Sequence, residues 1–148
     1  MKTGTIRISA AGLASALLIG AAPPPTGRLE VELQGRRNDK GWVRLCLTGV
    51  PSGFPDCSRD ARAWKRNLRA PGVTRITFDN LPPGDYAFSA VHDENGNEKV
   101  DFTLGMPREG VAFSNNAPVR FGPPKYAAAR FRIGPGTTRQ RVKFRYWL

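Results

Sequence analysis

The 148-residue sequence is poor in the side chains from which many enzyme and metal sites are built, since it has one histidine and two cysteines. Zinc sites that combine several cysteine and histidine ligands are therefore excluded. A Ser-His-Asp triad would have to use the single histidine, His92. Cys46 and Cys57 lack the CxxC spacing of redox and metal motifs, so we expect neither to be catalytic or to bind a metal.

Acidic residues are also scarce, because 12 Asp and Glu stand against 23 Lys and Arg and leave a net charge of +11. Glycine (16 residues) and proline (13 residues) are plentiful and favour short strands joined by turns over long helices. Hydrophobic residues make up 40% of the chain, so a folded core is expected rather than wholesale disorder. The length suits one domain.

The first 25 residues have the layout of a secretory signal peptide. Two cations precede an apolar run over residues 8–19, which is shorter than the ~20 residues that cross a bilayer. We expect a signal peptide at 1–22, a proline-rich linker at 23–27 and an exported domain, periplasmic or extracellular, at 28–148. After cleavage no membrane span is expected, and an uncleaved membrane anchor is the alternative.

In an exported protein the two cysteines favour a disulfide, because disulfides persist in oxidising compartments. Cys46 and Cys57 lie eleven positions apart, with Pro51, Gly53 and Pro55 between them, and can close a small loop. We expect a disulfide that contributes about 2–3 kcal/mol. Two free thiols are the alternative.

Alternation of apolar and polar side chains, the pattern of half-buried strands, runs through most of the domain. Residues 28–34 alternate, and residues 42–48 resume the pattern after a turn at 38–41. The two runs predict a hairpin, with Cys46 on the face opposite the aliphatic side chains. Further alternating runs lie at 74–78, 86–90, 131–133 and 142–146.

Two segments between these runs complete the prediction of the fold. Residues 58–70 fit either a short helix capped by Ser58 or a strand over 66–70. The segment F-x-x-L-P-P-G-x-Y at 78–86 predicts a tight crossover, after which the tyrosine anchors the next strand. With six or seven strands in all, we expect an all-β fold, an antiparallel two-sheet sandwich of immunoglobulin-like or transthyretin-like type, with a long irregular loop region.

The loop that follows His92 holds four of the twelve acidic residues within nine positions. Oxygen ligands stand at its alternate positions, as they do in loops that bind calcium. The candidate ligands are Asp93, Asn95, Asn97, the backbone carbonyl of Lys99, and Asp101. A divalent cation would offset the repulsion among the carboxylates, so the sequence predicts a weak Ca²⁺ site here.

The match to an EF-hand calcium loop is partial. Glu98 stands where that loop has glycine, and Leu104 stands where it has its bidentate glutamate. A loop in which Asp and Asn side chains bond their own backbone is therefore an open alternative. A different metal that uses His92 is another.

Residues 102–124 show no clear periodicity, which inside a small domain usually indicates a functional or specially braced loop. Ser114, Asn115 and Asn116 are candidate ligand-binding residues here, together with His92, and a glycan is one ligand that amide side chains suit. The alternative is that these side chains satisfy backbone groups of the irregular segment itself.

The last predicted strand and the residues before it carry cations at alternate positions, on one face: Arg139, Arg141, Lys143 and Arg145. Such a face could meet an anionic polymer of the cell envelope or an acidic protein. The alternative is a solvated edge strand whose charges discourage aggregation. Export and the lack of a recognition motif make nucleic acid an unexpected partner.

Several motifs occur in a fixed order along the domain: G-F-P, F-x-x-L-P-P-G-x-Y, H-D-E-N-G-N, L-G-x-P-x-E-G, F-S-N-N-A and F-G-P-P. In this order the chain resembles the bacterial family known as domain of unknown function 2141, over roughly residues 28–147. The resemblance implies an exported single-domain β-sandwich, and it implies no reaction.

These observations favour an exported, non-catalytic β-sandwich of the cell envelope that serves as a binding or accessory module. The alternative is a carbohydrate-active or hydrolytic enzyme that uses His92, Asp93 and residues 114–116. Neighbouring residues of a strand point to opposite faces, so His92 and Asp93 are poorly placed to act as a pair. No nucleophile elbow or phosphate-binding glycine loop is found.

Overall fold

The computed structural model describes residues 20–148, so the expected signal peptide at 1–22 lies almost wholly outside the described residues. From Gly27 onward the chain is mostly β, with several antiparallel pairings. The strands are β1 (Gly27–Gln34), β2 (Trp42–Thr48), β3 (Trp64–Arg69), β4 (Arg75–Leu81), β5 (Gly84–Asp93), β6 (Phe102–Thr103), β7 (Met106–Pro107), β8 (Gly110–Phe113), β9 (Phe131–Ile133) and β10 (Gly136–Lys143). The helical elements are η1 (Pro51–Gly53), η2 (Ser114–Asn116) and α1 (Tyr126–Ala129). In this part of the chain, no helix combines the length and hydropathy needed to cross a membrane.

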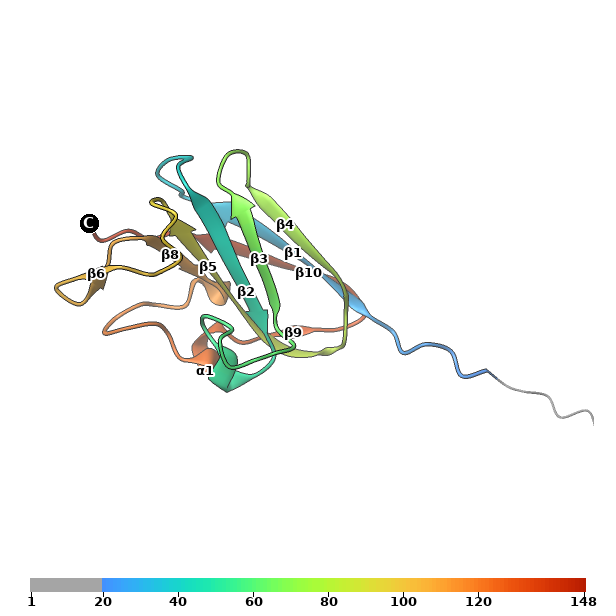
Figure 1. The fold of residues 1–148 in the computed structure, drawn as a ribbon. Coiled ribbons are helices and arrows are strands. Elements are labelled where there is room, and N and C mark those ends of the chain that lie inside the picture. Colours follow the sequence, from blue (N-terminus) through green and yellow to red (C-terminus); the bar gives the residue numbers. More distant parts are fainter. Residues whose placement is uncertain (1–19) are drawn as a thin grey trace, which may run out of the picture.

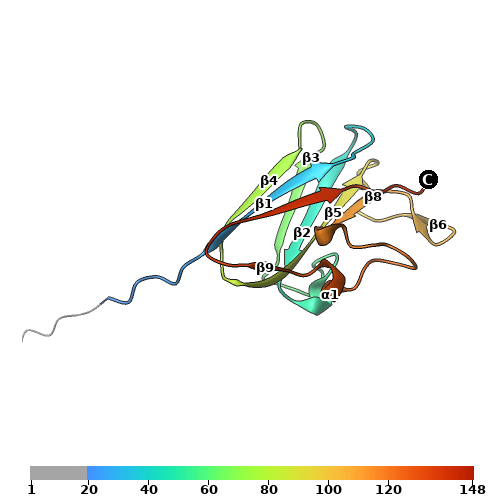
Figure 2. The same cartoon turned by 180° about the vertical axis from the view of Figure 1, so that it is seen from behind.

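Two sheets face each other across one hydrophobic core (Figures 1 and 2). One has the strand order β10-β1-β4 and the other β3-β2-β5-β8, with β9 paired to the start of β5. Strands β6 and β7 form a separate small hairpin that projects from one end of the molecule. The first sheet contributes Leu29, Val31, Phe78 and Val142 to the core, and the second contributes Val43, Leu45, Leu47 and Phe88.

The predicted hairpin between residues 28–34 and 42–48 is wrong, because β1 and β2 lie in different sheets. β1 pairs with β10 and β4, whereas β2 pairs with β3 and β5. The segment between them carries the chain from one sheet to the other, so the two aliphatic faces meet across the core. In a hairpin both faces would point the same way and would need a third layer to bury them.

The pairing of β1 with β10 is parallel, whereas the sequence predicted antiparallel sheets throughout. The register places Leu29 beside Thr138 and Leu33 beside Val142. These residues lie more than a hundred positions apart, and alternation within a strand records which face is buried but not the direction of a distant partner.

Residues 58–70 contain a strand, so the helix alternative is wrong. β3 runs from Trp64 to Arg69 and pairs antiparallel with β2. Ser58 does not cap a helix, because its backbone N–H and its hydroxyl both donate to the Asp56 carboxylate, at 2.9 and 2.7 Å. The side chain of Asp56 thus closes a local turn before the chain reaches β3.

The tyrosine of the proline-rich crossover anchors the next strand, as the sequence predicted. The Tyr86 hydroxyl donates to the carbonyl of Pro82 at 2.8 Å. Its ring packs edge-on against Trp64, with centroids 5.8 Å apart. At the crossover from β4 to β5, the Tyr86 hydroxyl therefore has a hydrogen-bond partner and the Tyr86 ring packs against the core.

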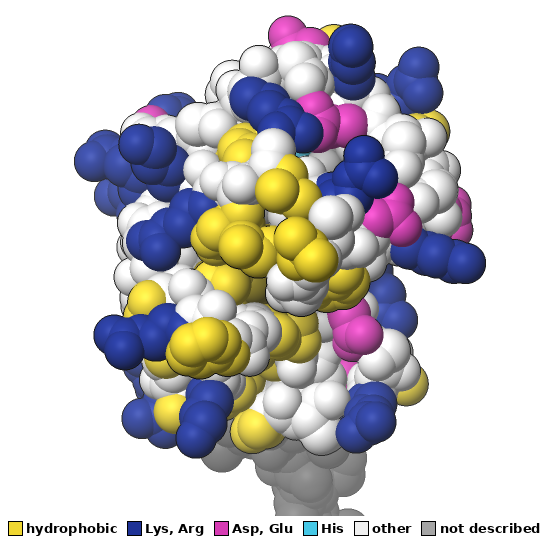
Figure 3. Space-filling view, turned by 90° about the vertical axis from the view of Figure 1, so that its left-hand side faces the viewer, with side chains coloured by type: hydrophobic (Ala, Val, Ile, Leu, Met, Phe, Trp, Pro, Cys, Tyr) yellow, Lys and Arg dark blue, Asp and Glu magenta, His cyan; other side chains and the backbone are white. Residues whose placement is uncertain are grey.

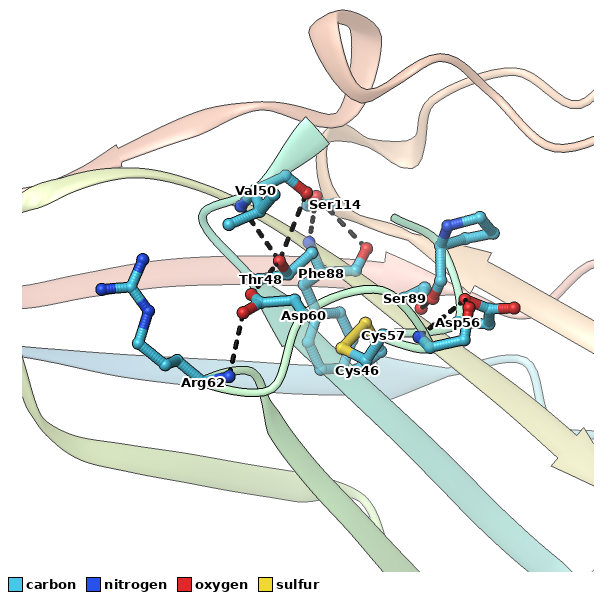
Figure 4. The surroundings of a disulfide bond; sticks show 12 residues. Cys46, Thr48, Val50, Asp56, Cys57, Asp60, Arg62, Phe88, Ser89 and Ser114 are labelled. Carbon is cyan, nitrogen blue, oxygen red and sulfur yellow. Dashed lines mark hydrogen bonds between the residues drawn. A yellow bond between two sulfur atoms is a disulfide. The ribbon is translucent and has the colours of Figure 1, made fainter. Parts of the chain in front are cut away.

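The structure contains the expected disulfide between Cys46 and Cys57, whose Cα atoms are 5.7 Å apart (Figure 4). Cys46 lies on the face of β2 opposite the core aliphatics, as predicted. The disulfide holds the segment after β2 against the outer face of the larger sheet. The Ser89 hydroxyl of β5 adds a hydrogen bond to the Pro55 carbonyl of the same segment.

A buried carboxylate holds the end of this segment (Figure 4). The hydroxyl of Thr48 donates to Asp60 Oδ2 at 2.6 Å, and the backbone N–H of Arg62 donates to Asp60 Oδ1 at 2.9 Å. The hydrogen bond from Thr48 holds the pKa of the Asp60 carboxyl below its ordinary value. Residues 50–63, whose only regular element is the short η1, are therefore fixed at both ends.

Replacing both cysteines by alanine should lower the free energy of unfolding by about 2–3 kcal/mol, because opening the 46–57 loop adds entropy to the unfolded chain. Urea denaturation of the oxidised protein and of the double variant measures the difference, and the reduced wild type should match the variant. Two alkylated thiols by intact mass, in freshly purified protein never exposed to reductant, would contradict the disulfide.

Candidate functional site

The carboxylate of Asp93 is fully buried at the end of β5 and organises the loop that follows. Arg44 Nε of β2 donates to Asp93 Oδ2 at 2.7 Å. The backbone N–H of Gly96 donates to Oδ1 at 2.8 Å, and that of Glu98 donates to Oδ2 at 3.0 Å. A charge-assisted hydrogen bond and two backbone donors satisfy this buried carboxylate. In return the carboxylate accepts from loop N–H groups, as the side chain of a helix N-cap accepts from the first N–H groups of a helix.

The remaining candidate calcium ligands bond to one another and to the backbone. Asn95 Oδ1 accepts from the N–H of Asn97, and Asn97 Oδ1 accepts from the N–H of Lys99, both at 3.0 Å. The amide nitrogens of Asn95 and Asn97 then donate to Asp101 Oδ2 at 3.1 and 2.7 Å. These two hydrogen bonds, that from Asn95 most, hold the pKa of the Asp101 carboxyl below its ordinary value.

Each of the crowded carboxylates has a partner, and Asp93 and Glu98 share Arg44. Arg37 forms an ion pair with Glu94, which lowers the pKa of that carboxyl. Arg44 also reaches Glu98 at 3.6 Å. The repulsion that motivated a divalent cation is thus offset by arginines and amides. Across residues 20–148, no group of three or more His, Cys, Asp or Glu side chains could hold a metal ion.

His92 is fully buried beside Asp93 but points to the other side of the sheet. Its Nε2 lies 2.8 Å from the carbonyl of Lys40, which can only accept, so Nε2 carries a proton and donates. Its Nδ1 lies 2.7 Å from the Tyr146 hydroxyl. Both ring nitrogens are therefore used to tie β5 to the β1–β2 connection and to the C-terminal segment.

Ser114, the first residue of η2, is buried beside Phe88 of β5. Its hydroxyl accepts from the N–H of Phe88 at 3.0 Å and donates to the carbonyl of Ala129 at 2.5 Å. Phe88 and His92 are four residues apart, about 13 Å along an extended strand. The structure does not bring Ser114 and His92 together, so the base and nucleophile that the hydrolase alternative needs are not adjacent.

Asn115 and Asn116 brace the irregular segment against β10. Both have positive φ, 57° and 47°, a conformation that asparagine tolerates better than most residues. Asn115 Nδ2 donates to the carbonyl of Arg130 at 2.8 Å. Asn116 Nδ2 donates to the carbonyl of Arg141 at 3.0 Å, and its Oδ1 accepts from the N–H of Lys143 at 2.9 Å. The amides thus satisfy backbone groups, which is the alternative the sequence left open.

The four cations predicted to form one face differ in their hydrogen-bond and ion-pair partners. Two form ion pairs with β1, Arg139 with Glu30 and Arg141 with Glu32, both at 3.1 Å. The guanidinium of Arg145 donates to the carbonyl of Asn116 at 3.3 Å. The outer face of this sheet therefore alternates in charge, because the glutamates of β1 stand in register beside the arginines of β10.

A cavity of about 170 Å³ with mostly apolar walls lies at the end of the molecule from which the β6–β7 hairpin projects. Phe102 and Met106 of the hairpin, Val119 and Pro123 of the loop after η2, and Trp147 line it. The polar groups at its walls are few, so this cavity is suited to apolar rather than polar groups.

Every large hydrophobic side chain that is exposed in residues 20–148 belongs to the segments around this cavity: Phe102, Leu104, Met106, Phe121 and Leu148. We call the β6–β7 hairpin (102–107), the loop 117–125 and residues 147–148 the apolar face. Figure 3 shows hydrophobic side chains gathered in the middle of this end of the molecule, with Lys and Arg around them. A soluble domain rarely gathers exposed apolar groups in this way without an interaction partner.

The β6–β7 turn has a feature that folding does not require. Leu104 and Gly105 both have positive φ, 52° and 77°, as in a type I′ hairpin turn, where asparagine or glycine usually precedes the glycine. Leu104 is strained there and its side chain is 95% exposed. Leu104 thus departs from the usual residue choice of this turn without a gain in packing, as residues at functional or strained sites do.

The sequence interpretation missed the apolar face, because it sought chemistry in polar and charged residues. A signal was present: Leu104 and Phe121 each precede a glycine in a segment with no strand or helix periodicity. A large hydrophobic residue beside a turn glycine has no core face to pack on, so it is expected at a loop tip.

A family model described as "Uncharacterized protein conserved in bacteria (DUF2141)" matches residues 31–141. The resemblance predicted from the order of the motifs is thereby confirmed. No curated protein and no solved structure matches the chain.

Replacing Asp93 by asparagine should lower the free energy of unfolding by about 3 kcal/mol, because an amide NH₂ would face the donors that the carboxylate now satisfies. Asp39→Asn is the matched control: Asp39 is exposed and pairs only with the nearby Arg36, so its loss should cost less than about 1 kcal/mol. Urea denaturation measures both. Equal costs would show that the Asp93 hydrogen bonds do not organise the loop.

The sequence predicted calcium binding by residues 93–101, whereas the hydrogen bonds of this loop favour the self-bonded alternative. An ion held by the oxygens of Asn95, Asn97 and Asp101 would require both amides to turn and to give up their present hydrogen bonds. We therefore expect the same melting temperature in millimolar calcium and in EDTA. A rise with the logarithm of calcium concentration, lost in Asp101→Asn, would instead establish a calcium site.

Proposed function

The chain belongs to the DUF2141 family of bacterial proteins, and we propose that it is an exported, non-catalytic β-sandwich of the cell envelope that acts as a binding or accessory module. Two facing sheets, and a first strand paired in parallel with the last, support an immunoglobulin-like or transthyretin-like sandwich.

The observation that carries the proposal is the apolar face. Its cavity is lined by side chains from segments far apart in the sequence, and its rim holds exposed phenylalanine, leucine and methionine side chains. Burying such groups is favourable, at about 25 cal/mol per Å² of apolar surface, and the isolated chain leaves them in water. A binding partner that covers them is the direct use of this arrangement.

The polar residues with catalytic potential support a binding role rather than a reaction. His92 and Ser114 are buried and bonded to backbone carbonyls, and Ser114 contacts Phe88, which lies about 13 Å along β5 from His92. The buried Asp93 carboxylate accepts three hydrogen bonds and points away from His92. Each of these groups has a structural partner that explains its burial.

Two observations support export. The sequence before residue 23 has the charge and hydropathy layout of a signal peptide. The two cysteines of the chain form a disulfide, a bond that persists in oxidising compartments and is rare in the cytosol. Both point to a protein that works outside the cytoplasm.

Expression of the full chain with a C-terminal tag, followed by cell fractionation and intact-mass measurement, tests this function. We expect a chain shortened by about 22 residues, with both cysteines oxidised, retained with the envelope fraction. Phe102→Ser/Met106→Ser should release it to the soluble periplasmic fraction. Arg141→Gln/Lys143→Gln/Arg145→Gln on the cationic strand is the comparison variant and should leave it in place.

An uncleaved, reduced chain in the cytosol would overturn the proposal of export. Release by the arginine and lysine variant, with no effect of the apolar variant, would move the binding surface to β10 and to an anionic or acidic partner.

A further inference from the structure

We propose that the apolar face binds the surface of an anionic phospholipid bilayer. The inference rests on the proposed function only in taking this face to be the binding surface at the envelope, and it names the partner. The hairpin 102–107 and the loop 117–125 would insert their tips among the lipid headgroups, with the body of the domain remaining in water.

The shape of the face favours a bilayer over a peptide. The side chains of Leu104 and Phe121 are almost fully exposed and do not line the cavity. A peptide bound in a cavity of about 170 Å³ would contact the walls and leave these tips in water. A bilayer surface buries projecting tips first, to a depth of about 5–10 Å for side chains of this kind.

Charge on the same two loops is complementary to anionic headgroups. Residues 102–108 and 117–125 contain Arg108, Arg120 and Lys125 and no acidic residue. Within the described residues, the side chains of these three cations form no ion pair, whereas Arg139 and Arg141 on β10 are paired with glutamates. Unpaired cations beside exposed apolar tips are the combination by which peripheral proteins attach to acidic membranes.

The orientation of the domain leaves this face accessible. Residues 20–26 leave β1 at the end of the molecule opposite the β6–β7 hairpin (Figures 1 and 2). The described N-terminal segment therefore does not cover the apolar face.

The base of the hairpin is held rigidly, as insertion of its tip requires. The N–H of Asp101 donates to the Glu109 carboxylate at 2.7 Å, and the N–H of Arg108 donates to the Asp101 carbonyl at 2.9 Å. Asp101 in turn accepts from the two asparagines of the 93–101 loop. The acidic loop thus serves as the support from which the hairpin projects.

Co-sedimentation of the oxidised protein, residues 23–148, with vesicles tests the proposal. Vesicles of phosphatidylglycerol and phosphatidylethanolamine should bind the protein, and vesicles of phosphatidylcholine alone should not. Leu104→Asn/Phe121→Ser should weaken binding at least tenfold. Its melting temperature should not fall, because both side chains are exposed and asparagine suits positive φ at position 104.

Two charge variants distinguish binding through the cations of the apolar face from general attraction between a basic protein and an anionic membrane. Arg108→Gln/Arg120→Gln/Lys125→Gln should weaken binding to the anionic vesicles roughly 100-fold, at about fivefold per cation near the surface. Arg139→Gln/Arg141→Gln/Lys143→Gln removes the same charge from β10, outside the apolar face, and should change binding less than about fivefold. Equal losses would show non-specific attraction and overturn the proposal.

Insertion has its own readout. Both variants carry Trp147→Phe, which removes the native tryptophan of the apolar face. A tryptophan at position 121, in Phe121→Trp, should then be quenched by brominated lipid in the anionic vesicles, whereas one at the exposed position 137 of β10, in Thr137→Trp, should not. Equal quenching at both positions would overturn the proposed orientation.

Failure of the lipid proposal is distinguishable from failure of the proposed function. No binding to anionic vesicles, while Phe102→Ser/Met106→Ser still releases the protein from the envelope, would identify a protein partner for the same face. Concentration-dependent dimerisation that Leu104→Asn/Phe121→Ser abolishes would identify a second copy as the occupant. Either result overturns membrane binding.

Discussion

The end of β5 places two consecutive polar side chains out of water, and their need for hydrogen-bond partners determines how this end of the molecule is built. A buried polar group without a partner is costly, so each of these two residues must draw other parts of the chain to it. His92 binds the connection that passes from the first sheet to the second, and it also binds the C-terminal segment. Asp93 binds Arg44 of β2 and the backbone of the loop that follows β5. Two adjacent residues on opposite faces of one strand therefore join four segments.

The same geometry explains an acidic loop on a basic chain. A buried carboxylate accepting several N–H groups can impose a loop conformation that a glycine-rich sequence alone would leave open. Gly41 shows how closely the parts approach, because a Cβ built there would lie 2.0 Å from the Asp93 carbonyl. The loop then supports the β6–β7 hairpin through Asp101, so polar groups inside the protein position apolar groups outside it.

Sequence patterns were sufficient where the physics is local. Alternation located β1, β2, β4 and β5, the cysteine spacing located the disulfide, and the proline-rich crossover located the Tyr86 anchor. The alternating run at 142–146 marked only the end of the last strand, because β10 spans Gly136–Lys143. They failed where distant partners decide the outcome, since alternation marks the buried face of β1 and β2 but not that these faces meet across a core. For the site, the hydrogen-bonding residues of the 93–101 loop were identified, but whether Asn95 and Asn97 present oxygen or nitrogen to Asp101 depends on backbone donors that a sequence does not display. The hydrophobic loop tips escaped notice because an exposed leucine has no periodic pattern of its own.

The parallel pairing of β1 with β10 has a consequence for the order in which the chain can fold. β1 is the middle strand of its sheet, and residues on its outer face pair with partners 109 positions later, as Glu30 does with Arg139. Contacts of such separation form slowly, because a long loop must close before they are made. Because synthesis begins at the N-terminus, β1 emerges early and β10 last. One edge of the first strand therefore stays open, with its backbone donors and acceptors unpaired, until nearly the whole domain has been made.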